Sequence, residues 1–399
     1  MAALTAILLL TTACIGVAAP SGWAGPSLAD GRLVIHSERG KLAAVDIDSL
    51  AVAWEFPGKG QKHVGGTKIV LQGIYGNPAI ANGTVYFGAY DGWVYALDLA
   101  SGERKWEADV GGRIIGGVVV AEGFLFVGSS NNQLHALDPA TGAERWFFAT
   151  GDDIWATPLV ADGVVYLAST DKKLYALDAA DGRERWPKPF KGGGALASTP
   201  VLADGTLVLG GLDRRLRAVD AASGQEKWSF KADNWFWTRP LVVGDTVYAG
   251  SLDGNVYAVA LADGKRLWSF NLEAPVRAAP VMVGDTLLVA SRKGRIAALN
   301  PENGQLSWAS FVELGKTLLA DPLPQEDVVY YSAQGGDVYK VTPKDGSVVR
   351  LFPLQVSTPA LSSTPTAGTP TPDTATPAPT PSATPSSGVR LAPTEVGAP

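Results

Sequence analysis

The sequence predicts an all-β protein, an eight-bladed β-propeller of four-stranded antiparallel blades. A block of about forty residues recurs from Ala24 to about Pro353, and four short strands per repeat of that length are typical of a propeller blade. The composition agrees, because 46 glycines and 12 tryptophans stand among many β-branched residues. Such a mixture favours short strands joined by tight turns.

Each copy contains four short apolar segments separated by turn signals. The first turn carries pairs such as Asp162-Gly163, and the second carries pairs such as Asp253-Gly254. A glycine marks the third turn, as in Ser101-Gly102. Two-residue hairpins that need positive φ favour these pairs, so the segments are expected to be antiparallel strands.

A tryptophan closes seven of the eight copies. We expect each one to dock against the adjacent blade, because a blade alone cannot cover both faces of its sheet. The eighth copy, Asp321 to Phe352, has Arg350 at this position, so the closing seam should be the weaker one. The ring could close head to tail, or residues near Gly16 to Ser21 could add a strand to the last blade. The docking residues are Trp54, Trp106, Trp146, Trp186, Trp228, Trp268 and Trp308.

The two ends of the chain differ from the repeats. Residues Ala2 to Ala13 form an apolar run that is too short to span a bilayer but is typical of a secretory signal. The segment Leu10-Thr11-Thr12-Ala13-Cys14 resembles a lipobox, so residues 1–14 are expected to be a signal segment and Cys14 to be lipidated. Simple secretion and a buried terminal strand are the alternatives. Residues 357–399 are rich in proline, threonine and serine and predict a disordered tail, which leaves 22–353 for the propeller.

Charge and cysteine content exclude several functions. The formal net charge is −6, so there is no basic excess to neutralise the phosphates of a nucleic acid. Cys14 is the single cysteine, so the repeats contain no disulfide, thiolate metal site or cysteine nucleophile.

The segment Ala136 to Trp146, Ala-Leu-Asp-Pro-Ala-Thr-Gly-Ala-Glu-Arg-Trp, resembles the tryptophan-docking motif of the pyrroloquinoline quinone-like repeat family. Ala96 to Trp106, Ala176 to Trp186 and Ala218 to Trp228 are similar. The resemblance implies the propeller fold, but fold alone does not choose a function. The family has a branch of quinone dehydrogenases and a non-catalytic branch, which includes a lipoprotein of the barrel-assembly machinery.

The residues do not indicate an enzyme. The quinone enzymes resemble one another in a cysteine pair beside the quinone and a calcium ion, and the repeats here have no cysteine. Most aspartates fall in turns, where they are expected to accept hydrogen bonds from backbone amides. His36, His63 and His135 occupy unrelated slots in the repeat. We therefore expect no catalytic residues, no cofactor and no metal, with a quinone-dependent dehydrogenase as the remote alternative.

One column of residues indicates a candidate site. Three places before the proline that opens each blade, or before Val118 in the third blade, the chain leads into the innermost strand. These residues should therefore surround one mouth of the central channel. Around the ring the column is Trp23, Tyr75, Ile115, Trp155, Ala197, Trp237, Arg277 and Leu319. An aromatic funnel with one guanidinium suits an apolar or peptide-like ligand, whereas ordinary packing of the blade ends is the alternative. The candidate binding residues are Trp23, Tyr75, Trp155, Trp235, Phe236, Trp237 and Arg277.

An insertion between the first two blades is the second candidate. Residues Pro57 to Gly73 contain basic residues and no acid. In an acidic protein such a loop could attract an anionic partner or lipid surface, or it could be a solvated loop without function. The candidate partner-binding residues are Lys59, Lys62, His63 and Lys68.

These observations favour a non-catalytic scaffold of the cell envelope, monomeric and on the extracytoplasmic side of a membrane. It would bind other proteins through its rim and mouth loops. The resemblance to the non-catalytic branch of the family implies a role in outer-membrane or envelope protein assembly. A strand added to a blade edge is one mode of such binding. An extracellular propeller that binds or senses a small ligand is the alternative.

Overall fold

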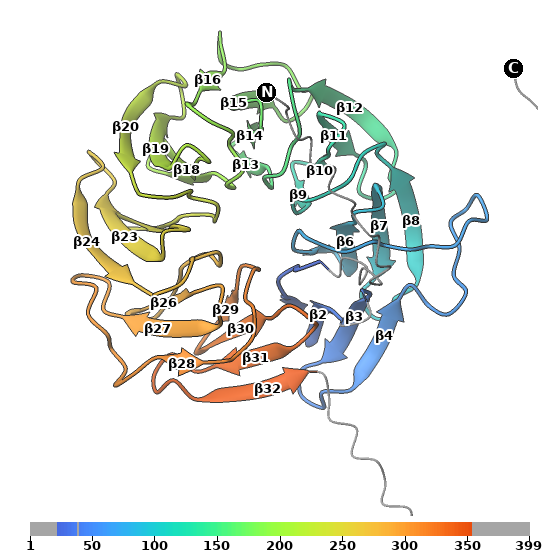
Figure 1. Ribbon diagram of the computed structural model, residues 1–399. Coiled ribbons are helices and arrows are strands. Elements are labelled where there is room, and N and C mark those ends of the chain that lie inside the picture. The colour runs from blue at the N-terminus through green and yellow to red at the C-terminus, as the bar shows by residue number, and fades with distance from the viewer. Residues whose placement is uncertain (1–21, 38–39, 353–399) are drawn as a thin grey trace, which may run out of the picture. The chain divides into compact units, whose positions relative to one another are not determined.

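The computed structural model describes residues 22–37 and 40–352, and within them it contains 32 strands. Each group of four consecutive strands forms one antiparallel sheet, which gives eight sheets. The sheets stand side by side around a ring (Figure 1). The predicted all-β, eight-bladed propeller is confirmed. Among the described residues there is no helix long and apolar enough to cross a membrane.

The strands follow one another through the ring without a crossover. The first four blades are β1 (Ser27–Ala29), β2 (Arg32–His36), β3 (Leu42–Asp46) and β4 (Val52–Phe56); β5 (Ala79–Ala81), β6 (Thr84–Gly88), β7 (Trp93–Asp98) and β8 (Arg104–Asp109); β9 (Val119–Ala121), β10 (Phe124–Gly128), β11 (Gln133–Leu137) and β12 (Glu144–Ala149); β13 (Leu159–Ala161), β14 (Val164–Ala168), β15 (Lys173–Asp178) and β16 (Phe190–Lys191).

The second half of the ring repeats this arrangement. Its blades are β17 (Val201–Ala203), β18 (Thr206–Gly210), β19 (Arg215–Asp220) and β20 (Glu226–Lys231); β21 (Leu241–Val243), β22 (Thr246–Gly250), β23 (Asn255–Ala260) and β24 (Arg266–Asn271); β25 (Val281–Val283), β26 (Thr286–Ala290), β27 (Arg295–Leu299) and β28 (Val312–Glu313); β29 (Leu323–Gln325), β30 (Val328–Ser332), β31 (Val338–Val341) and β32 (Val348–Phe352).

The two middle strands of each blade supply most of the core. In β14 four of the five residues are buried, and in β15 four of the six. Both faces of these strands are therefore covered, because each blade is packed between two neighbours. The turn between β13 and β14 places Asp162 at φ 50° and Gly163 at φ 71°. Successive positive φ values explain why Asp-Gly pairs occur at this turn.

The closing tryptophans join each of seven blades to the next. Trp228 shows the arrangement: its indole N–H donates a hydrogen bond to the carbonyl oxygen of Leu261 at 2.6 Å. The ring lies against Gly264, where a Cβ atom would come 2.6 Å from it. The seven indole hydrogen bonds span 2.6 to 3.2 Å. The glycine of turn three is therefore required in the blade that receives the tryptophan.

The closing seam uses a different contact. Blade eight, β29–β32, and blade one, β1–β4, are each complete from their own segment, so the ring closes head to tail in the described residues. Leu351 and Phe352 pack with Leu33 and Ile35 of blade one. Leu50 stands where the other blades have the docking glycine and packs against this cluster. The seam therefore has neither the docking tryptophan nor the glycine that would receive it.

The predicted signal segment 1–14 with Cys14, the segment Gly16 to Ser21 and the tail 357–399 lie outside the described residues. Their assignments remain predictions from the sequence.

Candidate functional site

Antiparallel pairing places all the connections between blades at one face of the ring. In each blade the third strand begins at turn two, and the antiparallel fourth strand ends beside turn two. The chain therefore leaves each blade at the end that carries turn two. The insertion 57–73 and the residues that lead into each innermost strand are such connections. Both connections therefore start from the face that carries the second turns, which we call the linker face.

A cavity of about 300 Å³ lies at the centre of the linker face. Its wall contains the whole column singled out from the sequence: Trp23, Tyr75, Ile115, Trp155, Ala197, Trp237, Arg277 and Leu319. Asn77, Thr157, Thr199, Arg239 and Asp321 add polar groups to the wall. Every blade thus contributes one member of the column to a shared cavity.

The next column is small because neighbouring backbones approach closely there. A Cβ atom on Gly76 would come 2.2 Å from the carbonyl oxygen of Gly116, and one on Gly116 would come 2.8 Å from that of Ala156. The hydroxyl of Ser198 donates a hydrogen bond to the carbonyl of Thr238 at 2.7 Å. Larger side chains would push the blades apart, so crowding at the axis sets the width of the cavity.

Arg277 is the centre of a cation–π cluster in the cavity wall. Its guanidinium carbon lies 4.8 Å from the ring centre of Trp23 and 4.5 Å from that of Trp237. Trp237 lies 5.9 Å from Trp155, and Trp23 meets Tyr75 edge to face at 4.3 Å. A guanidinium between two indole faces is held in place and partly stripped of water.

The charged groups of the cavity differ in whether they have a partner of opposite charge: Asp321 lies near Arg239, whereas Arg277 has no such partner among the described residues. Burial and the nearby charge of Arg292 lower the pKa of Arg277 from its usual value. Burial also raises the pKa of Asp321, which accepts a hydrogen bond from the amide of Ala279 at 3.0 Å and lies 4.0 Å from Arg239. The carboxylate is thus engaged with Arg239 and a backbone amide.

Phe236 is a correction to the predicted site. Its side chain is 1% exposed and packs against Phe230 and Tyr257 rather than lining the cavity. Phe236 belongs to the column that directly precedes the cavity residues in the sequence. The side chains of this preceding column pack inside the blades against small residues such as Gly210. This column is buried throughout and could have been recognised as apolar: Ile74, Ile114, Ile154, Leu196, Phe236, Val276 and Leu318.

Trp235 also lies outside the cavity wall. Its side chain is 42% exposed, and its backbone carbonyl accepts a hydrogen bond from the amide of Leu252. Of the aromatic run Trp235-Phe236-Trp237, only Trp237 reaches the cavity.

The insertion 57–73 forms a small hairpin that projects outward from the ring between β4 and β8 (Figure 1). Lys62 and Lys68 pair across it in an antiparallel bridge, and both are exposed, as is Lys59. Val64 near its tip is 86% exposed, and Val70 is 53% exposed. The structure therefore presents lysines and apolar side chains together on this loop.

His63 does not belong to the exposed basic surface, which corrects the prediction. Its side chain is 8% exposed, packs against the ring of Trp93 in a tilted arrangement with the ring centres 4.3 Å apart, and contacts the carboxylate of Glu107 at 3.1 Å. Glu107 also binds Arg104 and accepts a hydrogen bond from the amide of Val64 at 2.7 Å. The buried Glu107 anchors the hairpin, and nothing in the sequence pattern singled it out.

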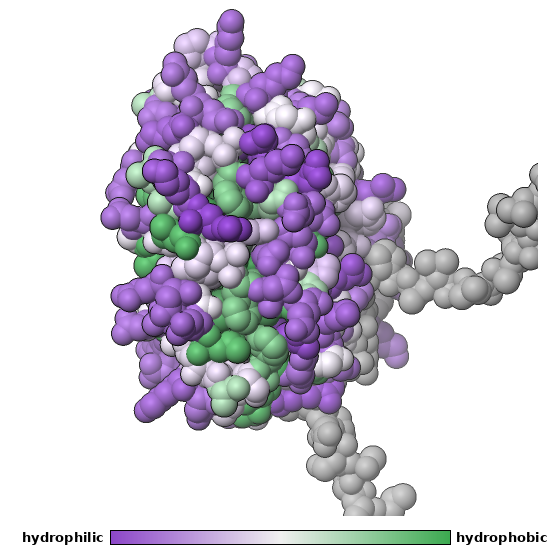
Figure 2. All heavy atoms as spheres, turned by 60° about the vertical axis from the view of Figure 1, so that its left-hand side comes forward, coloured by the Kyte–Doolittle hydropathy of each residue, from purple (hydrophilic) through white to green (hydrophobic). Residues whose placement is uncertain are grey.

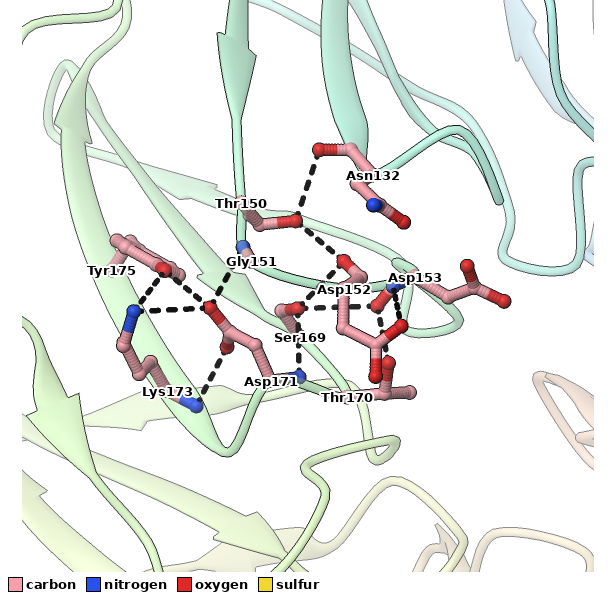
Figure 3. Close-up of polar contacts among 10 residues, drawn as sticks. All are labelled: Asn132, Thr150, Gly151, Asp152, Asp153, Ser169, Thr170, Asp171, Lys173 and Tyr175. Carbon is pink, nitrogen blue, oxygen red and sulfur yellow. Dashed lines mark hydrogen bonds and ion pairs between the residues drawn. The ribbon is translucent and has the colours of Figure 1, made fainter.

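The aspartates of the second turns have structural roles, as predicted. In blade four the Asp171 carboxylate accepts hydrogen bonds from the amide of Lys173, the hydroxyl of Tyr175 and the amide of Gly151 (Figure 3). Asp91 and Asp253 receive a tyrosine hydroxyl in the same way.

The same network holds the connection that carries Trp155. The hydroxyl of Ser169 donates to the carbonyl oxygens of Asp152 and Asp153 at 3.0 and 3.1 Å (Figure 3). Asp153 in turn accepts a hydrogen bond from the indole of Trp155 at 3.1 Å. The orientation of this cavity residue is therefore fixed by its linker.

The cavity does not fit a calcium-bound quinone. Calcium takes six to eight oxygen ligands, whereas the wall offers one carboxylate, Asp321, and one amide side chain, Asn77. The Asn77 oxygen already accepts a hydrogen bond from the amide of Gly25. In the described residues no group of three or more His, Cys, Asp or Glu side chains could hold a metal ion.

Eight four-stranded blades joined by docked tryptophans define a pyrroloquinoline quinone-like β-propeller. The family model described as outer membrane protein assembly factor BamB matches residues 16–114, 90–193, 188–317 and 252–367, and the chain belongs to this family.

Individual relatives are similar to this chain over a short stretch of sequence or at low sequence identity. The outer membrane protein assembly factor BamB of Xanthomonas campestris is 31% identical over 90 residues, which span 23% of this chain and 22% of that protein. The crystal structure of BamB from Moraxella catarrhalis superposes with a TM-score of 0.67 at 20% identity, over 79% of this chain and 95% of that one. A quinohemoprotein alcohol dehydrogenase from Pseudomonas putida superposes with a TM-score of 0.62 at 15% identity, over 80% and 69%. These two superpositions report the fold alone.

Proposed function

We propose that the chain is a non-catalytic scaffold on the extracytoplasmic side of the cell envelope, where a single propeller binds another protein during envelope protein assembly. The observation that carries this proposal is the insertion hairpin, which holds an 86% exposed valine, Val64, among lysines beside the outermost strand β8. Val70 on the same hairpin is 53% exposed, and apolar side chains that are exposed together among polar residues are typical of protein-binding surfaces.

The hairpin is anchored firmly enough to present this surface. The amide of Val64 and the ring of His63 both bind the buried carboxylate of Glu107. Little conformational entropy then remains to be lost when a partner docks. Membership in a family named for outer membrane protein assembly supports the same conclusion.

The outer rim offers further apolar surface. Figure 2 brings forward the side of the ring that carries β20 and β24, and hydrophobic residues gather there in patches between hydrophilic ones. Leu267 on the outermost strand β24 is 55% exposed. It lines a hollow of about 210 Å³ whose wall also contains Val243, which is 41% exposed at the turn-one end of the innermost strand β21. A rim of this kind supports contact with a partner over more than one blade.

The proposal is tested by placing a photo-crosslinking residue at Val64 of the full chain in the source cells. We expect an adduct with an envelope protein, identified by mass spectrometry. Ala222 is the matched control, because it is exposed on a third turn at the opposite face. Equal labelling from both positions, or recovery of the chain with cytoplasmic proteins alone, would contradict the proposal.

A further inference from the structure

Arg277 has an unmet hydrogen-bonding need. Its Nε atom is buried and finds no partner in the described part of the chain. Buried polar groups in folded proteins almost always have a hydrogen-bond partner. The stacking of the guanidinium between Trp23 and Trp237 satisfies its faces but none of its N–H groups.

The charge of Arg277 is also unpaired. No carboxylate of the described residues comes within 4.0 Å of its nitrogens, whereas the one carboxylate of the wall, Asp321, lies 4.0 Å from Arg239. Arg292 is close enough to act on Arg277 through its charge. The cavity wall therefore contains two arginines, Arg277 and Arg239, and one aspartate, Asp321, so positive charge is in excess there.

The apolar part of the wall faces the same space. Trp155, Ile115 and Leu319 come from three other blades and line the cavity with Arg277. A cavity of about 300 Å³ matches the size of a small-molecule site, in which apolar walls combine with few polar groups. A ligand that satisfies both parts must carry an anionic group and an apolar body.

We propose that the central cavity binds a small carboxylate with an attached apolar ring, and that Arg277 receives the carboxylate through charge-assisted hydrogen bonds. Guanidinium and carboxylate match in a planar, two-point geometry. This function goes beyond the scaffold role, because it uses the axis of the ring and not the insertion hairpin or the rim. The carboxylate could belong to a free aromatic acid or to the C-terminus of a short peptide.

The first test titrates the full chain with N-acetylphenylalanine and, in parallel, with its uncharged amide. Binding is followed by calorimetry and by tryptophan fluorescence excited where phenylalanine does not absorb, since Trp23, Trp155 and Trp237 line the cavity. We expect the acid to bind at least about tenfold more tightly than the amide, as loss of a charge-assisted hydrogen bond requires. Equal affinities for acid and amide, or no binding of either, would overturn the proposal.

A pair of variants assigns the effect to Arg277. Arg277→Gln should weaken acid binding at least about tenfold while leaving the weak amide binding unchanged. Arg113→Gln is the matched control, because its guanidinium lies 5.0 Å over Tyr90 but does not line the cavity. Full binding by a folded Arg277→Gln protein would overturn the assignment, and the comparison of acid with amide remains decisive if that variant does not fold.

A third titration separates the two sources of the carboxylate. The tripeptide Gly-Gly-Phe should bind more tightly than N-acetylphenylalanine if the site takes a peptide end, and no more tightly if it takes a free acid. Inorganic phosphate that binds as tightly as the acid would overturn the proposal, because the apolar wall would then contribute nothing. Failure of crosslinking at Val64 would leave these results unaffected, so the two proposals are separable.

Discussion

At the scale of single residues, a residue that differs in type from its equivalents in the other blades indicates a local difference in packing or charge. His36 is such an exception, because the equivalent positions in the other blades are glycine, alanine or serine. Its side chain is buried and its Nε2 atom has no hydrogen-bond partner among the described residues. Burial lowers the pKa of His36 from 6.5 to about 4. The folded protein therefore resists protonation of this ring more than the unfolded chain does.

The sign of the resulting pH dependence follows from linkage. A depressed pKa in the folded state gives stability that is present above pH 6.5 and lost as the pH falls towards 4. We expect the wild type to lose about 2 kcal/mol more than His36→Ala in free energy of unfolding between pH 7 and pH 5. Denaturant titrations at the two pH values measure this difference.

The comparison between the two proteins is necessary because other groups titrate in the same range. Burial raises the pKa of Asp91 to about 6, so its contribution has the opposite sign and falls as the pH rises through 6. Asp91 is present in both proteins, and its effect cancels in the difference. Equal losses in wild type and variant would show that His36 does not titrate as its burial requires.

The candidate site shows which residue-level features the sequence could reveal. Alignment of the repeats placed the eight cavity residues correctly, because each one occupies the same step before an innermost strand. Phe236 was wrongly assigned to the site because it lies between Trp235 and Trp237. Its own column is apolar and buried in every blade after the first. The anchoring of His63 by Glu107 depends on a contact between segments 44 residues apart, and no repeat pattern encodes it.

At the scale of the blade, the unit of stability is the docked tryptophan with the glycine that receives it. Gly264 lies at φ 70°, and an added Cβ would come 2.6 Å from the Trp228 ring. Gly205 in turn one lies at φ 67°, yet its added Cβ would meet nothing within 4 Å. The two glycines share a left-handed backbone conformation, which glycine adopts without strain, and they differ in the docking contact.

Alanine substitutions at these two glycines therefore isolate the docking contact. Gly205→Ala should cost about 1 kcal/mol through its left-handed backbone. Gly264→Ala should cost about 1–3 kcal/mol more, because the added methyl overpacks the Trp228 ring. Thermal and denaturant unfolding measure both. If the two variants were equally stable, docking would not be the reason for glycine at turn three.

At the scale of the whole molecule, the ring is one closed chain of blade contacts with one unlike link. The sequence predicted that link from Arg350, and the structure supplies what replaces the tryptophan. Leu351, Phe352 and Leu50 fill the seam, while Arg350 turns to the carboxylate of Asp337. The order of the blades and the position of the seam could be predicted from the repeat. The apolar contact that replaces the tryptophan could not be predicted, because it occurs only once in the ring and no repeated pattern marks it.

A ring with one undocked seam should open there first. Hydrogen exchange should therefore be faster in β1–β4 and β29–β32 than in the blades between them, since local opening follows the least stabilised contact. Phe352→Ala should increase this difference, because removing a buried phenylalanine costs about 3–5 kcal/mol.

Trp186→Ala is the matched comparison: it removes a docked side chain of similar burial in mid-ring, so it should move the fastest exchange to blades four and five. Mass-spectrometric exchange resolves these segments. Uniform protection around the wild-type ring, or fastest exchange in a docked blade, would show that the apolar seam is as strong as the tryptophan contacts it replaces.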